Sequence, residues 1–489
     1  MSEVVSARKE SGYRWDVLPD AQSLLETILA SPGENVKHSA ARCVTRHQLG
    51  GRTFYAKIYF HNENILEPVK YFFKNSSSRS EWRIAPLLQQ LGIPVVPHLA
   101  HGELWSWRGL EKSALVTEGP AGFAPVNPNS TSTLIQTALG KFLRHLHEAT
   151  VFHDDLHISN LLYSLAKNQF CLVDLDNMRI LLKPLNLEQR LDNLATLNRR
   201  YPLEREFFEA YGEDFIRYKN KLGRRTDRKM RSSIPKKLKL LFHARQAFAP
   251  KTIGELKWHV RLASINEPLE SILKDPDGFL KNRACILKNG TRSTVGCANG
   301  FVLKRFNPKK ISTVVLDMVR ASRGRRGFRT ARHLELLKIA TPLAIAYADR
   351  RRFGFVMRNY FIMQEIHGGA YLWERPQSRR ALVVRLSELI AKTHEEGFSH
   401  RDLKETNLII DKDDLPYLID LDALRYMRKI SDPRAAIELA RLAAGFSRRV
   451  QISKKEKVIF LKNYCLQRGI ENWRWWWNAI EKHLPAKSK

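Results

Sequence analysis

Cysteine is scarce in this chain, and the few copies form no recognisable framework. Its 489 residues include five cysteines, namely Cys43, Cys171, Cys285, Cys297 and Cys465. An odd number of widely spaced cysteines without a C-x-x-C pair argues against a disulfide framework and against a zinc site. We therefore expect free thiols in a reducing cytoplasm.

Long apolar runs are also missing. No stretch approaches the roughly 18 consecutive apolar residues that a membrane-spanning helix needs, and Met1–Asp16 lacks the apolar core of a secretory signal. We therefore expect neither a membrane span nor a cleaved leader. No low-complexity segment argues for disorder, and the length predicts roughly two to four domains.

Acidic residues are outnumbered, because 50 Asp and Glu stand against 82 Lys and Arg, for a net charge of +32. This charge predicts attraction to a polyanion, which can be a nucleic acid, an anionic membrane surface or a phosphorylated glycolipid. A generally basic surface that maintains solubility is the alternative. Residues Arg217–Lys251 hold thirteen Lys or Arg and one Asp, which we interpret as a solvated face or linker, with a docking patch as the alternative. Residues Arg320–Arg332 hold six arginines and no acid.

The clearest motif lies in the second half, where residues 400–407 read H-R-D-L-K-E-T-N. The pattern H-R-D-L-x-x-x-N is the catalytic loop of protein-kinase-like phosphotransferases, in which the Asp accepts the proton of the attacking hydroxyl and the Asn holds magnesium. The apolar run Tyr417–Ile419 then leads to Asp420, where such enzymes place a second magnesium ligand. We therefore predict Asp402 as the catalytic base, and Asn407 and Asp420 as metal ligands.

The first half carries a second copy of this pattern. Residues 153–160 read H-D-D-L-H-I-S-N, and the apolar run Phe170–Val173 leads to an aspartate. Upstream, each half has an aromatic and β-branched strand with one lysine, and the distance from that lysine to the catalytic-loop Asp is 98 residues in both (155 − 57 and 402 − 304). Equal spacing of matched motifs predicts a tandem duplication of one fold.

Phosphoryl transfer mainly requires positioning and the neutralisation of charge on the phosphate oxygens. We expect Lys304 to hold the nucleotide phosphates in the second copy. In the first copy the same roles fall to Lys57 for the phosphates, Asp155 for the acceptor hydroxyl, and Asn160 and Asp174 for magnesium. These oxygen ligands suit magnesium better than zinc or iron. We interpret His153 and His400 as structural residues that fix their loops.

Glu81 is the expected ion-pair partner of Lys57, because a helix over Ser80–Leu91 ends at Gly92 as a helix should. The matched position of the second copy is Gly327. Glu335 is the nearest substitute there, although nothing in the sequence shows that it reaches the lysine.

Two apolar strands ending in Glu118 and Glu365 are the expected hinges, where a nucleotide would also bind. Amphipathic helices over Leu134–Ala149 and Ala381–Glu396 lead into the catalytic loops. Neither copy has a G-x-G-x-x-G loop, so we expect only that a β-hairpin covers the nucleotide.

These patterns predict an α+β fold with two tandem protein-kinase-like domains, each with a small β-rich N-lobe and a helical C-lobe. We place an N-terminal extension at 1–34, domain 1 at 35–248 and domain 2 at 249–489. The aromatic run Trp473–Trp477 favours core packing of a terminal helix, with interfacial membrane contact as the alternative.

The motifs resemble the lipopolysaccharide kinases of the Kdo/WaaP family. The likeness rests on the lysine strands, on the two catalytic loops, and on the endings Asp174-Leu175-Asp176 and Asp420-Leu421-Asp422, which are closer to the D-F-D of that family than to D-F-G. The resemblance implies phosphorylation of a heptose or Kdo hydroxyl of the lipopolysaccharide inner core, with ATP and Mg²⁺ as cofactors. It further implies an anionic glycolipid substrate, no nucleic acid, and peripheral contact with the cytoplasmic face of the inner membrane of a Gram-negative bacterium.

Two alternatives stay open. The second copy has Gly327 where the first has Glu81, and this missing glutamate is compatible with one copy being a pseudokinase that scaffolds the other. The intact H-R-D of the second copy is compatible with a protein kinase, although no A-P-E anchor follows Asp420.

Overall fold

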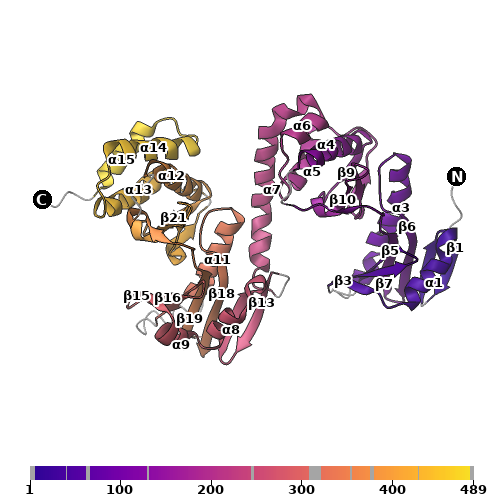
Figure 1. Ribbon diagram of the computed structural model, residues 1–489, viewed down its shortest axis with the longest axis horizontal. Coiled ribbons are helices and arrows are strands. Elements are labelled where there is room, and N and C mark those ends of the chain that lie inside the picture. Colours follow the sequence, from indigo (N-terminus) through magenta and orange to yellow (C-terminus); the bar gives the residue numbers. More distant parts are fainter. Residues whose placement is uncertain are drawn as a thin grey trace. The chain divides into compact units, whose positions relative to one another are not determined.

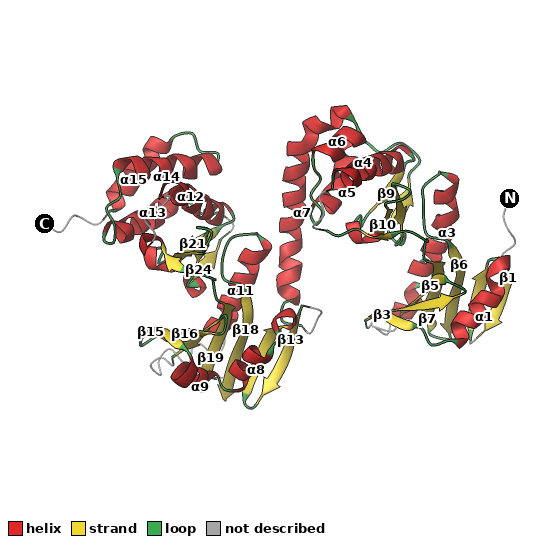
Figure 2. Ribbon diagram, viewed as in Figure 1, coloured by secondary structure: helices red, strands yellow, loops and turns green. Residues whose placement is uncertain are grey.

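The structure is a computed structural model that describes residues 6–10, 12–39, 41–61, 67–128, 132–243, 247–307, 321–352, 355–374, 379–427 and 429–484. The chain divides into two compact units, Met1–Met230 and Arg231–Lys489. In each unit, strands gather in one lobe and helices in the other (Figures 1 and 2). The α+β class that the sequence predicts is therefore confirmed.

The small lobe of the first unit is a seven-stranded antiparallel sheet in the order β1-β2-β6-β7-β5-β4-β3. Its strands are β1 (Ser6–Glu10), β2 (Tyr13–Val17), β3 (Glu34–His38), β4 (Arg42–Leu49), β5 (Arg52–Phe60), β6 (His98–Ser106) and β7 (Gly109–Glu118). Residues 1–34, for which we predicted an extension, supply β1, β2 and helix α1 (Gln22–Ala30). Trp15 of β2 and Ile28 of α1 are buried in one cluster with Phe54 of β5, so this segment contributes to the core of the small lobe.

The small lobe of the second unit repeats this sheet, with the order β13-β14-β18-β19-β17-β16-β15. Its strands are β13 (Phe248–Ile253), β14 (Leu256–Arg261), β15 (Cys285–Asn289), β16 (Ser293–Ala298), β17 (Phe301–Phe306), β18 (Ala344–Arg352) and β19 (Phe355–Gln364). Each strand matches one of the first sheet in order and position, so the predicted duplication is confirmed. The boundaries that we gave for the two domains stay predictions.

The predicted lysine strands are β5 and β17, and each follows a tight turn. Gly50 and Gly51 have φ of 57° and 75° between β4 and β5, while Gly300 has φ of 79° between β16 and β17. Glycine suits such turns because it adopts positive φ without steric cost. The expected hairpin is therefore present in both units.

The helices reproduce the duplication as well. The first unit has α2 (Glu67–Lys70), α3 (Ser77–Gln90), α4 (Thr133–Glu148), α5 (Leu187–Asn198) and α6 (Arg205–Tyr211), and the second has α8 (Glu267–Lys274), α9 (Pro276–Gly278), α11 (Arg323–Leu336), α12 (Arg379–Glu395), α13 (Asp432–Ser447), α14 (Lys454–Gln467) and α15 (Trp473–His483). Helix α3 begins at the N-cap Ser76, whose side chain accepts a hydrogen bond from Arg79 N, and ends before Gly92, which has φ of 70°. Helices α3, α4 and α12 confirm the predicted helical segments.

Short strands carry the catalytic loops. In the first unit these are β8 (Ala124–Pro125), β9 (Val151–His153), β10 (Leu161–Ser164), β11 (Gln169–Leu172) and β12 (Met178–Ile180), in sheets β11-β10-β8 and β12-β9. In the second they are β20 (Ala370–Tyr371), β21 (Phe398–His400), β22 (Leu408–Ile410), β23 (Pro416–Leu418) and β24 (Leu424–Tyr426), in sheets β20-β22-β23 and β21-β24. A single 3-10 turn, η8 (Leu421–Ala423), lies between β23 and β24.

The basic stretch that we interpreted as a solvated face or linker is mostly helix α7 (Lys219–Leu240). The boundary between the two units falls within this helix, which therefore links them. Its apolar side chains are buried, Leu222 in a core cluster of the first unit and Ile234 and Leu238 in one of the second. Its basic residues lie on the other faces, where Arg225 and Lys229 form ion pairs with Asp192 of α5. Arg320, the first residue of the other basic segment, lies outside the described residues.

The tryptophan-rich run forms helix α15. Trp476 is 1% exposed and packs against Tyr464 with ring centroids 5.3 Å apart, whereas Trp475 is 44% exposed. Core packing, the interpretation that the sequence favoured, is therefore confirmed for Trp476. Among the helices described, none combines the length and the apolar character needed to cross a membrane.

Candidate active sites

In the first unit, Lys57 lies on β5 with its ammonium group against two carboxylates. Lys57 Nζ is 3.2 Å from Glu81 Oε2 on α3 and 3.8 Å from Asp174 Oδ1, which follows β11. The predicted ion pair between Lys57 and Glu81 is thus present. It holds the lysine beside the aspartate for which we predicted a metal-binding role.

Glu81 is held by more than the lysine. Its carboxylate is 1% exposed and accepts hydrogen bonds from Tyr59 OH at 2.8 Å and from Leu175 N at 3.4 Å. Burial alone would raise the pKa of Glu81, but the Lys57 ammonium, His98 and the Tyr59 hydroxyl outweigh it and lower the pKa to about 2. The carboxylate is therefore charged at neutral pH, and it fixes Lys57 through a buried ion pair.

The second unit arranges its lysine differently. Lys304 Nζ is 2.5 Å from Asp420 Oδ1, just after β23, and 2.6 Å from Asp422 Oδ1 in η8. Glu335 does not reach the lysine, because it is occupied by Arg261 at 2.6 Å and by Arg332 at 2.5 Å. Because Gly327 stands where the first unit has Glu81, the lysine is bound by Asp420 and Asp422 instead.

The electrostatics of this trio follow from its burial. Burial would lower the pKa of Lys304, but Asp422 and Asp420 outweigh it and raise the pKa. Burial would also raise the pKa of Asp420, yet the hydrogen bond from Asp422 and the Lys304 ammonium hold that pKa well below its usual range. Asp422 has a raised pKa, first through burial. Asp420 is therefore the stronger acid of the pair, and Lys304 stays protonated.

The catalytic loops of the two units share one set of backbone-anchoring hydrogen bonds. Asp155 N donates to His153 Nδ1 and Asp402 N donates to His400 Nδ1, both at 3.3 Å. Burial lowers the pKa of His153 to about 4 and also lowers that of His400, so both imidazoles are neutral acceptors at pH 7. This geometry supports the structural role that we predicted for both histidines.

The two asparagines bind back to the same loops. Asn160 Nδ2 donates to Asp155 O at 3.1 Å, and Asn407 Nδ2 donates to Asp402 O at 2.8 Å. Asn160 O accepts from Val173 N at 3.1 Å, just before Asp174 in the chain, and Asn407 O accepts from Ile419 N at 2.9 Å in the same manner. Each asparagine is therefore fixed between the catalytic aspartate and the strand-end aspartate.

The two hinge glutamates are not equivalent. In the sheet register Glu118 pairs with Phe54, whereas Phe301, the counterpart of Phe54, pairs with Gln364. Glu365 therefore lies one residue beyond the position that matches Glu118. Because successive side chains along a strand point to opposite faces, the two glutamates are not expected to point to the same face of their sheets. The side chain of Glu118 forms an ion pair with Arg52 at 2.5 Å.

Three residues near the sites were missed in the sequence. His157 Nε2 is 2.7 Å from Asp155 Oδ1, and Lys404 Nζ is 2.8 Å from Asp402 Oδ2. Each comes two positions after its catalytic aspartate, a repeat that the aligned loops contain. Arg42 of β4 lies 3.6 Å from Asp174 Oδ2. Because burial lowers the pKa of His157 while Lys404 is a cation, Asp155 and Asp402, for which we predicted the catalytic role, have partners of different charge.

A buried polar cluster beneath each loop was also missed. His147 of α4 contacts Tyr211 OH at 2.7 Å through Nδ1 and Asn193 Oδ1 at 3.0 Å through Nε2, and Asn193 Nδ2 donates to His153 O. An amide oxygen only accepts, so Nε2 carries the proton and Nδ1 accepts from Tyr211. The cluster therefore ties α4, α5 and α6 to the first catalytic loop.

The second unit builds the same cluster with a carboxylate. His394 of α12 contacts Tyr464 OH at 2.8 Å and Glu438 Oε2 at 3.2 Å, and Glu438 also accepts from Ser399 Oγ and from His400 N. Burial would raise the pKa of Glu438, but these donors outweigh it and lower the pKa. His147 and His394 precede their catalytic aspartates by the same interval (155 − 147 and 402 − 394), which was the available signal in the sequence.

Comparison with known proteins places this geometry in a family. The sequence profile of the lipopolysaccharide kinase (Kdo/WaaP) family matches residues 27–218 and 302–464. Curated proteins give no match. Among solved structures, WaaP in complex with acyl carrier protein is 20% identical, with a TM-score of 0.33, and the match covers 44% of this chain and 97% of that one. A crystal structure of WbdD is 12% identical, with a TM-score of 0.26 and coverage of 40% and 49%. A structure of the bifunctional kinase-methyltransferase WbdD is 11% identical, with a TM-score of 0.25 and coverage of 39% and 47%.

The family profile thus matches twice, once over each set of lysine, catalytic loop and strand-end aspartate described above. Together the two matched regions span more than half of the chain. The chain belongs to the lipopolysaccharide kinase (Kdo/WaaP) family.

Proposed function

We propose that the chain uses ATP to phosphorylate a heptose or Kdo hydroxyl of the lipopolysaccharide inner core, at the cytoplasmic face of the inner membrane. The observation that carries this proposal is the arrangement of the first unit, where Glu81 holds Lys57 beside Asp174. An aspartate, Asp155, lies on an anchored loop with its side chain 56% exposed. A partly buried lysine for phosphates and an accessible carboxylate for a hydroxyl are the groups that this reaction requires.

Each residue then has a chemical role. Lys57 binds the phosphates of the nucleotide, and Glu81 keeps its ammonium group in place. Asp155 orients the acceptor hydroxyl and accepts its proton as the bond to phosphorus forms. His157, which is 2.7 Å from that carboxylate, positions Asp155.

Magnesium fits the residues present. Asn160 and Asp174 in the first unit, and Asn407 and Asp420 in the second, would hold it through the hard oxygen ligands that it prefers. The described residues contain no cluster of three or more His, Cys, Asp or Glu that could bind a metal by itself. A pair of protein ligands leaves coordination positions for phosphate oxygens. Bound Mg²⁺ supplies neutralisation of the charge on the transferred phosphoryl group.

The net charge of +32 supports an anionic acceptor at a membrane surface. A basic protein surface close to a membrane attracts anionic lipids over about one Debye length, roughly 8 Å at physiological salt. We therefore propose peripheral contact with the inner membrane, without a spanning segment in the described chain.

A second candidate function applies to the second unit, which we propose as a regulatory pseudokinase if its lysine stays bound to Asp420. The contact at 2.5 Å between Lys304 and Asp420 favours this reading, because the same aspartate is needed for magnesium. Nucleotide binding by Lys57→Met and Lys304→Met variants distinguishes the two. Loss of a site in only the Lys57→Met variant supports the pseudokinase, whereas loss of one site in each variant supports two kinases.

The test of the main proposal is phosphate transfer from radiolabelled ATP to purified core oligosaccharide by the full chain with Mg²⁺. Removing a general base costs about 10²–10⁴-fold in rate, so Asp155→Asn should lose transfer by that factor. Asp154→Asn is the matched control, because Asp154 is the preceding carboxylate and binds Arg179 at 2.7 Å instead of facing an acceptor. Equal transfer by Asp155→Asn and Asp154→Asn, or no transfer to any core acceptor, would refute the proposal.

A further inference from the structure

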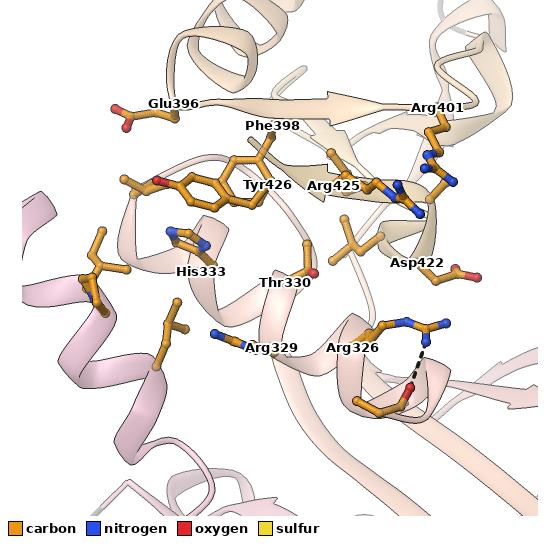
Figure 3. A pocket seen from close by; sticks show the side chains of 18 of the residues that line it. Arg326, Arg329, Thr330, His333, Glu396, Phe398, Arg401, Asp422, Arg425 and Tyr426 are labelled. Carbon is orange, nitrogen blue, oxygen red and sulfur yellow. Dashed lines mark hydrogen bonds between the residues drawn. The ribbon is translucent and has the colours of Figure 1, made fainter. Parts of the chain in front are cut away.

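A cavity of about 850 Å³ lies in the second unit, on the side of α11 that faces η8 and β24. Its walls come from α11, from the ends of β21 and β24, and from residues 231–238 of α7 (Figure 3). The volume falls within the roughly 300–1,000 Å³ of small-molecule sites. Lys304, Asp402 and Asp420 do not line it, although Asp422, which contacts Lys304, does.

The two acidic side chains of the cavity are already neutralised. Glu396 forms an ion pair with Arg231 at 2.7 Å, and Asp422 contacts Lys304 at 2.6 Å. Neither carboxylate is therefore available to balance the other cations of the wall.

The remaining charge is positive and comes from both lobes of the unit. Arg329 projects from α11, Arg401 lies in the loop that follows β21, and Arg425 belongs to β24. Within the described part of the chain, no carboxylate forms an ion pair with these three guanidinium groups. Partial desolvation, and then the charges of Arg425 and Arg434, lower the pKa of Arg401, as expected where like charges gather.

The spacing on α11 aims further groups at the same space. Arg326, Arg329, Thr330 and His333 follow one another at i, i+3, i+4 and i+7, which places them on one face of the helix. Figure 3 shows Arg326, Arg401 and Arg425 toward one end of the cavity, with Arg329 on the α11 side.

The other end of the cavity is aromatic. The rings of His333 and Tyr426 lie 4.9 Å apart, and Phe398 lies 4.9 Å from His333 and 5.3 Å from Tyr426. Burial and the charge of Arg329 lower the pKa of His333 to about 4, so this ring is neutral at pH 7. Tyr426 is 59% exposed, which leaves part of its ring for contact with a ligand.

We propose that this cavity binds a small molecule that carries at least two phosphate groups on a ring. The phosphates lie among the arginines, because planar guanidinium groups bind phosphate oxygens in pairs. The ring lies against His333, Phe398 and Tyr426. A phosphorylated sugar, free or as the headgroup of a glycolipid, and a nucleoside polyphosphate share this chemistry.

The bound phosphates connect the two lobes of the second unit. Arg329 of the small-lobe helix and Arg401 and Arg425 of the helical lobe line the same cavity, and their like charges repel. A multiply charged anion between them turns this repulsion into attraction. The ligand thereby fixes α11, which carries Gly327 where the first unit has Glu81. This proposal goes beyond the transfer reaction and does not require it.

The test is calorimetric binding of inorganic tripolyphosphate to the full chain at physiological salt, where screening reduces binding to exposed charges. A charge-assisted hydrogen bond contributes enough for about tenfold in affinity, so Arg329→Gln/Arg425→Gln should weaken binding about a hundredfold. The matched control, Arg448→Gln/Arg474→Gln, removes the same charge from two exposed arginines outside the cavity. Circular dichroism establishes that both variants fold.

A second variant separates this cavity from the nucleotide sites. Lys57→Met/Lys304→Met/Asp422→Asn should retain the tripolyphosphate binding that Arg329→Gln/Arg425→Gln loses. Asp422 is changed together with its partner Lys304, so that no unpaired carboxylate is left in the cavity wall. Hydrogen exchange of residues 323–336 and 424–426 should slow on binding. Equal binding by the cavity variant and its control, or binding lost only with the lysines, would overturn the proposal. Neither readout uses a phosphate acceptor, so failure of the kinase assay leaves this result intact.

The ring is tested with glucose 1,6-bisphosphate. Tyr426→Ala should weaken its binding while leaving tripolyphosphate binding unchanged, and an unchanged affinity for both would remove the ring from the proposed ligand. Vesicles that contain a bisphosphorylated glycolipid distinguish a lipid headgroup from a free metabolite. If the vesicles compete with glucose 1,6-bisphosphate for the cavity, the ligand is a headgroup, and if they do not, it is a free metabolite.

Discussion

Replacing Glu81 with alanine should destabilise the first unit more than any exposed carboxylate does. The change removes a side chain that is 1% exposed and leaves Lys57, 15% exposed at its side chain, and the buried Tyr59 hydroxyl without their partner. Breaking a buried ion pair by deleting one partner costs about 3–5 kcal/mol. The variant should also lose affinity for nucleotide, because nothing then directs Lys57 toward the phosphates.

Scanning calorimetry of the full chain measures this cost in the transition of the first unit. For a unit of roughly 200 residues, each kcal/mol shifts Tm by about 2–4 °C, so Glu81→Ala should lower it by roughly 10 °C. Glu335→Ala is the control from the second unit. Its carboxylate is 28% exposed and its pairs with Arg261 and Arg332 are closer to surface ion pairs, which contribute about 0–1 kcal/mol. If the two variants shift their transitions equally, the argument from burial is refuted.

Acidification and two further substitutions test the charge of Glu81, the cluster around Glu438 and the packing of α4 on α6. Folding lowers the pKa of Glu81 from its ordinary value of 4.5 to about 2. The ionised carboxylate therefore stabilises the first unit fully at pH values above 4.5, and this contribution is lost as the pH falls toward 2. The difference in Tm between wild type and Glu81→Gln should therefore shrink with acidification, and a constant difference would contradict it. Glu438→Ala leaves three buried donors unpaired and should cost the second unit about 3–5 kcal/mol in denaturant unfolding; an unchanged midpoint would contradict it. Gly140→Ala places a Cβ 2.5 Å from Phe207 O, so α4 and α6 must separate at a cost of about 1–3 kcal/mol. A rise in Tm would show that α4 and α6 do not pack tightly at this point.

The sequence was sufficient for the features that depend on local patterns. The lysine strands alternate in the period of a sheet, and the catalytic loops contain their own anchors, as Asn160 and Asn407 show by bonding within five residues. Local hydrogen bonds of this kind are fixed by spacing alone. Both features therefore appear where they were predicted.

Other features depend on how distant segments meet. The partner of Lys304 could not be predicted, because it requires Asp420 to adopt a left-handed φ of 61° that turns two carboxylates toward β17. The one-residue offset between Glu118 and Glu365 arises in the strand register, which the ends of the apolar runs did not reveal. The contribution of Trp15 to the first core is likewise tertiary, since β2 pairs with a strand much later in the chain.

The buried clusters beneath the two loops match each loop to the helix that supports it. Asn193 both accepts from His147 and donates to His153 O, whereas Glu438 only accepts, from His394, Ser399 and His400 N. A recombination that exchanged α5 and α13 alone would direct a carboxylate at the carbonyl of His153, with no proton between them. Each helix therefore fits only the loop above it, and a chimaera that exchanges α5 and α13 should fold only if the loops are exchanged with them.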